Sequence, residues 1–332
     1  MNTKESILTL FGKQKELSVK EITDRLGSSK QMVHLVLKKL LEAGVVEKFG
    51  RTPKTIYRVT QKKKTKEKQL PGVTSKENEF LKKNFLLVTE SGELREGISG
   101  FGLWCEKRQL PTESTLKEFM EAKAGYDHYY TTQGTINGID KLKNTKAYDK
   151  VHLDHLFYLD FYAIERYGKT RLGTLLHYAK QGQNKFLMKI MMDEIRERII
   201  SFVAEQGADA VAFVPPTIRR EVQIMKFIRE DLRLPLPVIE IKKLGGIIPI
   251  PQKTLGKLED RITNAENTYS VTGKQKFRHV VLIDDEANSG ATLNQVAEKI
   301  KNKQMAKEVS GLAITGHLKG FDVSMEMNVV SA

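Results

Sequence analysis

The sequence predicts an α/β protein with a small N-terminal α+β domain and a larger domain built on a mainly parallel sheet. Three observations lead to this prediction. The 332 residues are enough for about two domains at roughly 150 residues each. Helical periodicity dominates the first 45 residues, and two short β segments follow it. From about residue 185, apolar strands alternate with helices, which is the pattern of β-α-β units.

The composition is that of a globular protein with enough apolar material for a core. Apolar residues make up 40% of the chain and charged residues 29%. The single cysteine, Cys105, excludes a disulfide framework and a zinc site made of cysteines alone. The N-terminus lacks the apolar core of a secretory signal, and no stretch reaches the ~18 apolar residues that a membrane span needs. We therefore expect a cytoplasmic protein without a membrane partner.

Positive charge is concentrated at the start of the chain. Residues 1–72 hold 17 Lys and Arg against 7 Asp and Glu, so ten of the formal surplus of 14 charges lie there. A concentrated positive field attracts polyanions and steers their approach. The alternative is a solvated basic surface that keeps the chain soluble.

Residues 1–60 carry the sequence signals of three helices and a hairpin. A capping box of Ser18 and Glu21 opens the second helix, which stops at Gly27. Ser28 or Ser29 caps a third helix that has apolar residues at helical spacing. The other predicted elements are a first helix at Lys4–Phe11 and β segments at Val45–Phe49 and Thr55–Val59.

This order of elements resembles the winged helix-turn-helix DNA-binding domains of bacterial regulators. The resemblance implies that DNA lies against the polar face of the third helix and against the hairpin, which would be the wing. The residues expected to contact DNA are Lys30, Gln31, His34 and Lys38 on the helix and Arg51 and Lys54 on the wing. A protein-interaction module is the alternative for such a domain.

Two segments connect this domain to the parallel sheet. Residues 61–74 are predicted to be an extended basic linker, because their like charges repel one another. Residues 75–155 are predicted to form a connecting, hood-like region. Within it we expect a strand at Leu86–Val88, a packed turn at Gly97–Cys105 and a helix at Thr115–Ala122.

The alternating pattern of the larger domain predicts parallel strands with helices on both faces, and ligands of such sheets bind beyond the carboxyl ends of the strands. The predicted strands are Ala210–Val214, Leu236–Ile241, His279–Ile283 and Val309–Thr315, and the helices are Lys185–Glu205, Ile218–Leu232 and Ala291–Lys303.

Three acids and a small turn follow the third of these strands. The carboxylates of Asp284 and Asp285 can accept hydrogen bonds from the two hydroxyls of a ribose, and Glu286 is a candidate base. Free amides and hydroxyls at the start of the next helix suit a phosphate group. The candidate phosphate-binding residues are Ala287, Asn288, Ser289, Gly290, Ala291 and Thr292.

This stretch resembles the phosphoribosyl-pyrophosphate (PRPP) loop of type I phosphoribosyltransferases. Other segments resemble the ComF-like members of that family, which are relatives of amidophosphoribosyltransferase. The segments that carry this second resemblance are Tyr167–Gly182, Val214-Pro215-Pro216 with Arg219, Arg220 and Gln223, and Gln252, Leu255, Arg261 and Asn264.

The resemblance implies a Rossmann-like phosphoribosyltransferase domain at residues 156–320, with residues 321–332 as a tail. Asp284, Asp285 and Glu286 would be its catalytic acids, with Mg²⁺ held by PRPP and by Asp284 and Asp285. Lys180 stands where the family usually has a lysine. The implied pyrophosphate loop contains Thr217, Arg219 and Arg220, and the implied mobile loop contains Lys253, Lys257 and Arg261.

The chain also departs from the family pattern. The lone Cys105 rules out the zinc ribbon with which such proteins commonly begin, and Glu221-Val222 replaces a usual Gly-Phe-Asn run. A different interpretation takes Ala163–Thr170 as the phosphate-binding loop of a nucleoside triphosphatase. Its intervening Ile, Glu, Arg and Tyr are bulky for a loop that wraps phosphate with backbone amides.

These observations leave three functional hypotheses. In the first, the protein is an enzyme that joins ribose 5-phosphate to ammonia, an amine or a nucleobase, and the winged helix localises or regulates it. In the second, it is a regulator in which PRPP changes the affinity for DNA, and by linkage DNA changes the affinity for PRPP. In the third, it is an accessory protein of DNA uptake or processing. A homodimer is expected in each case.

Overall fold

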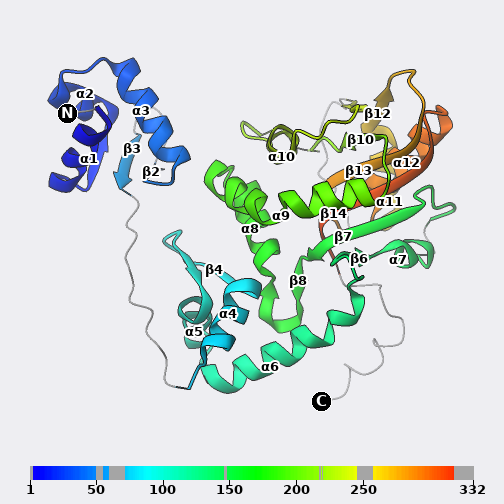
Figure 1. Ribbon diagram of the computed structural model, residues 1–332, viewed down its shortest axis with the longest axis horizontal. Helices are drawn as coiled ribbons and strands as arrows, with labels where there is room; N and C mark the ends of the chain where they lie inside the picture. Colours follow the sequence, from blue (N-terminus) through cyan, green and yellow to red (C-terminus); the bar gives the residue numbers. More distant parts are fainter. Residues whose placement is uncertain are drawn as a thin grey trace. The chain divides into compact units, whose positions relative to one another are not determined.

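The computed structural model describes residues 3–49, 55–59, 72–145, 148–216, 218, 220–244 and 257–317. The chain forms two compact units, Met1–Lys68 and Gln69–Ala332 (Figure 1). None of the helices in the described ranges is long and apolar enough to cross a membrane.

The N-terminal unit packs three helices against a small antiparallel sheet. The predicted capping box is confirmed, since Ser18 and Glu21 bond each other's backbone at the start of the second helix, and Ser29 caps the third. A strand that the sequence analysis missed, β1 (Glu16–Ser18), pairs with β3. The other elements are α1 (Thr3–Lys13), α2 (Val19–Leu26), α3 (Lys30–Glu42), β2 (Val46–Phe49) and β3 (Ile56–Val59), with strand order β1-β3-β2.

The second unit is a mixed α/β structure around a mostly parallel central sheet. Its five strands lie in the order β10-β13-β14-β7-β6, and the first four are parallel. Only β6 runs antiparallel to its neighbour. The predicted mainly parallel sheet is therefore confirmed. The strands are β6 (Ile136–Asn137), β7 (His155–Phe161), β10 (Ala210–Phe213), β13 (Phe277–Ala287) and β14 (Ala306–Gly316).

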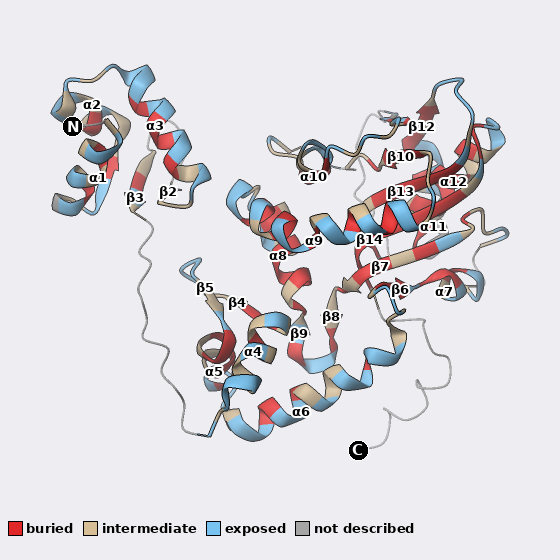
Figure 2. Ribbon diagram, in the orientation of Figure 1, coloured by how far each residue is buried: buried red, intermediate tan, exposed pale blue. Residues whose placement is uncertain are grey.

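Helices cover both faces of this sheet, so its central strands are buried on both sides (Figure 2). Val281 and Ile283 of β13 pack against helices on one face, and Val280 and Leu282 belong to the core on the other face. The first face is covered by α8 (Arg171–Gln181), α9 (Lys185–Glu205) and α10 (Ile224–Leu232), and the second by α12 (Ala291–Asn302).

Two elements predicted for the larger domain differ in the structure. The strand expected at Leu236–Ile241 contributes only a bridge from Val238 to Val211, and the chain then forms β11 (Glu240–Lys243). This strand pairs with β12 (Tyr269–Thr272) in a separate antiparallel sheet, and α11 (Leu258–Thr268) precedes β12. The helix expected from Ile218 begins at Ile224, because the residues before it form the loop beside the cavity described below.

The region before the sheet is folded rather than merely connecting. The expected strand at Leu86–Val88 is confirmed as β4. The packed turn expected at Gly97–Cys105 is wrong, because Phe101, Trp104 and Cys105 are buried at helical spacing on α5. The elements here are α4 (Ser75–Asn84), β4, β5 (Leu94–Glu96), α5 (Gly97–Glu106), α6 (Thr112–Gly125), η1 (Asp127–Tyr129) and α7 (Ile139–Lys143).

The segment Ala163–Thr170 is a tight hairpin and does not form a phosphate-wrapping loop. Strands β8 (Ala163–Ile164) and β9 (Gly168–Lys169) flank the short helix η2 (Glu165–Tyr167). The Tyr167 ring is buried, with its centroid 4.8 Å from that of Phe119. Since the segment is a hairpin whose Ile164 and Tyr167 side chains are buried in the core, it gives no support to the nucleoside triphosphatase interpretation.

Candidate functional site

A cavity of about 350 Å³ lies at the carboxyl ends of β10 and β13. One wall consists of the end of β13, the turn after it and the first residues of α12, from Asp284 to Leu293. The rest of the lining comes from the loop after β10, the end of α8, and one residue each of α10, α11 and β12. The lining residues from these other elements are Lys180, Gln181, Val214, Pro215, Pro216, Ile218, Arg220, Met225, Arg261 and Tyr269.

The structure brings most of the residues predicted for this site together. All nine residues from Asp284 to Thr292 line the cavity, as do Arg220 and Arg261. Lys257 is exposed and is not part of the lining. Thr217, Arg219 and Lys253 lie outside the described residues, as do Arg51 and Lys54 of the predicted wing.

In the N-terminal unit, the predicted DNA-contacting residues of α3 share one solvent-exposed face. Buried Val33, Val36 and Leu37 hold the opposite face against the core. The four exposed residues are Lys30, Gln31, His34 and Lys38.

Asp285 is buried beside a lysine from the neighbouring helix. It follows Val281 and Ile283 at alternate positions of β13, so its side chain points toward α8. There Lys180 Nζ donates a hydrogen bond to Asp285 Oδ1 at 2.7 Å, and the aspartate is only 6% exposed. Burial alone would lower the pKa of Lys180, but the carboxylates around it outweigh burial and raise this pKa. Lys180 therefore stays charged and supplies the cation that Asp285 needs.

Asp284 has a different environment, although it is the next residue. Its Oδ1 accepts a hydrogen bond from the backbone N–H of Asp285 at 2.8 Å. Desolvation, followed by the charge of Asp285, raises the pKa of Asp284 well above its ordinary value, and Lys180 only partly opposes this. A carboxyl group with a raised pKa can form hydrogen bonds with hydroxyl groups. It can also bind a cation, which would lower its pKa again.

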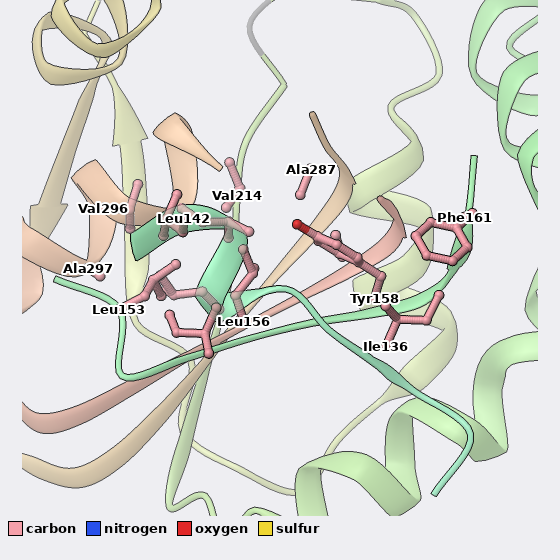
Figure 3. Close-up of a cluster of buried hydrophobic side chains, with 14 of the residues drawn as sticks. Ile136, Leu142, Leu153, Leu156, Tyr158, Phe161, Val214, Ala287, Val296 and Ala297 are labelled. Carbon is pink, nitrogen blue, oxygen red and sulfur yellow. The ribbon is translucent and has the colours of Figure 1, made fainter. Parts of the chain in front are cut away.

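The turn between β13 and α12 has a backbone that suits an anion. Gly290 adopts a left-handed φ of 79° and begins α12 without a capping side-chain bond. A Cβ atom at Gly290 would lie 2.8 Å from Leu142 Cδ1. Both the left-handed φ and this close contact therefore require glycine at the position. Figure 3 shows Leu142 within the buried cluster that includes Ala287 at the end of β13. The amides of the first turn of α12 are thus directed to the cavity end of the helix.

Two residues that the sequence analysis missed hold this turn in place. Lys141 Nζ donates hydrogen bonds to the carbonyl oxygens of Asn288 at 3.1 Å and His317 at 2.6 Å. The Tyr148 hydroxyl donates to the carbonyl oxygen of Ser289 at 2.8 Å. Burial lowers the pKa of Lys141 to about 8. Neither residue lies in a recognisable motif, so only the folded chain reveals their contacts with the turn.

Arg220 joins the loop after β10 to the end of α8. Its guanidinium donates to the carbonyl oxygen of Lys180 and to Oε1 of Gln181, both at 3.0 Å. The same loop is held by Gln223, whose Nε2 donates to the Arg220 carbonyl at 2.8 Å. A cation is therefore fixed on the cavity wall formed by the loop after β10.

The carboxylates here do not form a metal site of their own. Across the described ranges, no group of three or more His, Cys, Asp or Glu side chains could hold a metal ion. Each neighbouring acid instead has a protein partner, since Asp285 pairs with Lys180 and Glu286 Oε1 lies 3.1 Å from His317 Nε2. A cation bound at Asp284 would thus take most of its ligands from a bound molecule and from water.

Comparisons with known proteins add little. No family model matches the chain, and no curated protein matches it. Among solved structures it is similar to a purine phosphoribosyltransferase from Pyrococcus horikoshii Ot3, with 22% identity and a TM-score of 0.24 over 38% of this chain and 72% of that one. The sheet topology given above defines the fold.

The ion pair of Lys180 and Asp285 makes a testable contribution to stability. Lys180→Met leaves a buried carboxylate without its cation, and we expect the free energy of unfolding of the larger unit to fall by about 3–5 kcal/mol. Combining it with Asp285→Leu should restore most of the loss, because both members of the buried ion pair are then removed and Asp285 no longer needs a cation. Urea unfolding followed by circular dichroism measures both. A double variant no more stable than Lys180→Met would contradict this assignment.

The raised pKa of Asp284 predicts a pH-dependent cost to stability. The folded protein holds this proton to a higher pH than the unfolded chain, whose aspartate titrates near ~4. The free energy of unfolding of the wild type therefore falls as pH rises between these two pKa values. Asp284→Asn has no carboxyl group at this position and does not show this decrease. We expect the stability of Asp284→Asn relative to wild type to increase from about pH 5 to about pH 9 in urea unfolding. A difference that is constant with pH would show that the carboxyl titrates normally.

Proposed function

We propose that the cavity binds PRPP and that the unit Gln69–Ala332 is a ComF-like phosphoribosyltransferase of type I. It would transfer the ribose 5-phosphate group to a nitrogen nucleophile and release pyrophosphate. The observation that carries this proposal is the cavity itself, in which the acids ending β13 and the uncapped start of α12 face a shared space.

The 5-phosphate group would lie on the turn from Asn288 to Thr292. The backbone N–H groups and the positive end of α12 favour an anion there, and Gly290 lets the backbone approach it closely. The hydroxyls of Ser289 and Thr292 add two donors at the cavity wall. Lys141 and Tyr148 support this role, because they hold the carbonyl oxygens of the turn from behind.

The ribose and the pyrophosphate would contact the remaining walls of the cavity. Asp284 accepts hydrogen bonds from the ribose hydroxyls, with Asp285 beside it and Lys180 balancing the charge. Arg220 neutralises the pyrophosphate from the loop after β10, together with Thr217 and Arg219. Arg261 lines the same cavity and would act with them. The mobile loop that the family resemblance implies, with Lys253 and Lys257, would close over the site.

Mg²⁺ fits this site as an ion that arrives with PRPP. Three basic and three acidic side chains line the cavity, so the walls alone do not neutralise a pyrophosphate. Asp284 is the carboxylate with the raised pKa, and a cation beside it would favour its ionised form. When bound, Mg²⁺ supplies positive charge to the pyrophosphate oxygens.

In the reaction, the chain's own residues position the sugar and stabilise charge. The turn and the acids hold the ribose phosphate at both ends, which fixes its anomeric carbon relative to the nucleophile. Arg220 and Arg261 stabilise the charge that develops on the departing pyrophosphate. Loop closure would exclude water from the cavity.

We further propose that the N-terminal unit is a winged helix that binds DNA through α3. Its four exposed residues Lys30, Gln31, His34 and Lys38 suit phosphates and base edges. The surplus of ten positive charges in residues 1–72 supports the same interpretation. Formation of a homodimer stays a prediction.

Calorimetric titration of PRPP into the full chain, with Mg²⁺ present, tests the cavity assignment. We expect saturable binding in wild type. Thr292→Val removes a hydroxyl from the phosphate turn and should weaken binding at least about tenfold, because a hydrogen bond to a charged group contributes roughly 1.5–3 kcal/mol. Thr272→Val, on β12 and outside the cavity, is the matched control. Absence of binding in wild type would overturn the proposal, whereas binding without turnover would indicate the PRPP-sensing regulator.

Binding to a mixed-sequence DNA duplex at several salt concentrations tests the N-terminal proposal. Lys38→Ala removes one positive charge from α3, so we expect weaker binding and a slope of log affinity against log salt that is shallower by about one. Lys226→Ala removes an exposed lysine from α10 and serves as the control. Equal slopes for wild type and Lys38→Ala would show that this face of α3 does not contact DNA.

A further inference from the structure

Two large apolar side chains on α3 are exposed, although the N-terminal unit has a core that could bury such groups. Met32 is 48% exposed and Leu35 is 53% exposed. Within the described ranges, the other large apolar residues with this exposure all belong to the second unit. Apolar residues scattered singly on a surface need no explanation. Met32 and Leu35 are three positions apart, so they are neighbours on the surface of one helix.

Leu35 lies close to the centre of the exposed face of α3. At about 100° a residue, the direction opposite the core-facing side chains falls between Gln31 and Leu35. Gln31, Leu35 and Lys38 follow one another at spacings of four and three, so they form one line along this face. Figure 2 shows the buried and exposed positions along α3. The core-facing residues are Val33, Val36, Leu37 and Leu40.

The surroundings of Leu35 are basic. From Lys30 to Lys39, α3 has three lysines and no acid. Lys38 and Lys39 lie one turn after Leu35 and on opposite sides of it, and all three lysines are exposed. The face is therefore apolar at its centre and positively charged around that centre.

The major groove of duplex DNA has the complementary arrangement. Its edges are rows of phosphates, and the C5-methyl groups of thymines project into it as apolar contacts. The groove is about 12 Å wide and admits an α-helix. An acidic protein could also pair with the lysines, but the surplus of ten positive charges extends over residues 1–72 and favours a polyanion. We therefore take duplex DNA as the occupant of this face.

Gln31 favours the same base pair as Leu35. A glutamine side chain can form two hydrogen bonds with N6 and N7 of adenine, and an apolar side chain packs against the methyl group of thymine. Gln31 precedes Leu35 by one turn on the same line of the helix. Both residues therefore suit sites that contain A·T pairs.

We infer that α3 recognises A·T base pairs in the major groove, with Leu35 and Met32 packed on thymine methyl groups and Gln31 bonded to adenine. This inference rests on the proposed DNA binding of the N-terminal unit and names the sequence feature that the unit selects. The lysines around Leu35 bind phosphates, and such contacts position a protein on DNA without reading its sequence.

Selection from a pool of duplexes with a randomised centre tests the inference. The full chain is mixed with the pool and the bound fraction is sequenced, and we expect A·T pairs to be enriched. The most enriched duplex is then made once with thymine and once with deoxyuridine, which differs only by the missing C5-methyl group. We expect the thymine duplex to bind at least about threefold more tightly, because burying one apolar carbon changes an affinity by that much.

Leu35→Ala removes the inferred methyl contact and leaves every charge in place. Because Leu35 is exposed and alanine favours helices, we expect this variant to fold as the wild type does, which circular dichroism checks. It should bind the thymine duplex more weakly and lose most of the preference for thymine over deoxyuridine.

Two further variants separate this contact from general effects. Lys38→Ala should weaken binding of both duplexes equally and keep the preference for thymine, because it removes a phosphate contact. The matched control is Phe186→Ala, which removes an exposed apolar side chain from α9 in the second unit and should change neither affinity nor preference.

The outcomes distinguish this inference from the function on which it rests. Selection without enrichment of A·T pairs, equal affinities for the thymine and deoxyuridine duplexes, or a preference that survives Leu35→Ala would overturn the inference and leave DNA binding in place. A change of oligomeric state in Leu35→Ala, measured by sedimentation, would assign this face to contacts between copies of the chain and would also overturn the inference. Absence of binding to any duplex would overturn the DNA-binding proposal and the inference together.

Discussion

The cavity depends on a cation placed beside two consecutive aspartates of a buried strand. Asp284 and Asp285 continue a strand whose preceding residues are buried on both faces, so neither carboxylate can be hydrated as it would be on a surface. For Asp285, the ammonium group of Lys180 replaces the missing hydration, because Nζ donates a hydrogen bond to Oδ1 at 2.7 Å. The helix that carries Lys180 must therefore end at this edge of the sheet, and Arg220 binds the same helix end.

The turn from Asn288 to Thr292 is held in place by residues distant in sequence. Lys141 and Tyr148, which lie about 140 positions earlier in the chain, bind its carbonyl oxygens and leave its amides facing the other way. Asn294 on α12 adds a fixed point, since its buried side chain accepts hydrogen bonds from the backbone of His152 and Leu153. The region before β7 therefore contributes contacts that hold this turn and α12.

Sequence patterns predicted the parts of this protein that local chemistry determines. Helix α9 begins and ends where its periodicity indicates, and the capping box of Ser18 and Glu21 forms as expected. Sequence patterns did not predict the features that depend on strand pairing and on contacts between distant segments of the folded chain. The apolar run suggests that the strand ends at Ile283, yet β13 continues to Ala287 because β14 pairs with it that far. The contacts of Lys141 and His317 have no local signal, because they arise from the packing of distant segments.

The length of β13 explains how three consecutive acids come to have three different environments. If the strand ended at Ile283, Asp284, Asp285 and Glu286 would share one flexible loop and repel one another. Because the strand continues, alternation sends Asp285 toward Lys180 and places Asp284 and Glu286 on the other side. Pairing with β14 then brings His317 to Glu286 and leaves Asp284 with the raised pKa. The backbone pairing of two strands thus gives three consecutive carboxyl groups three different sets of neighbours.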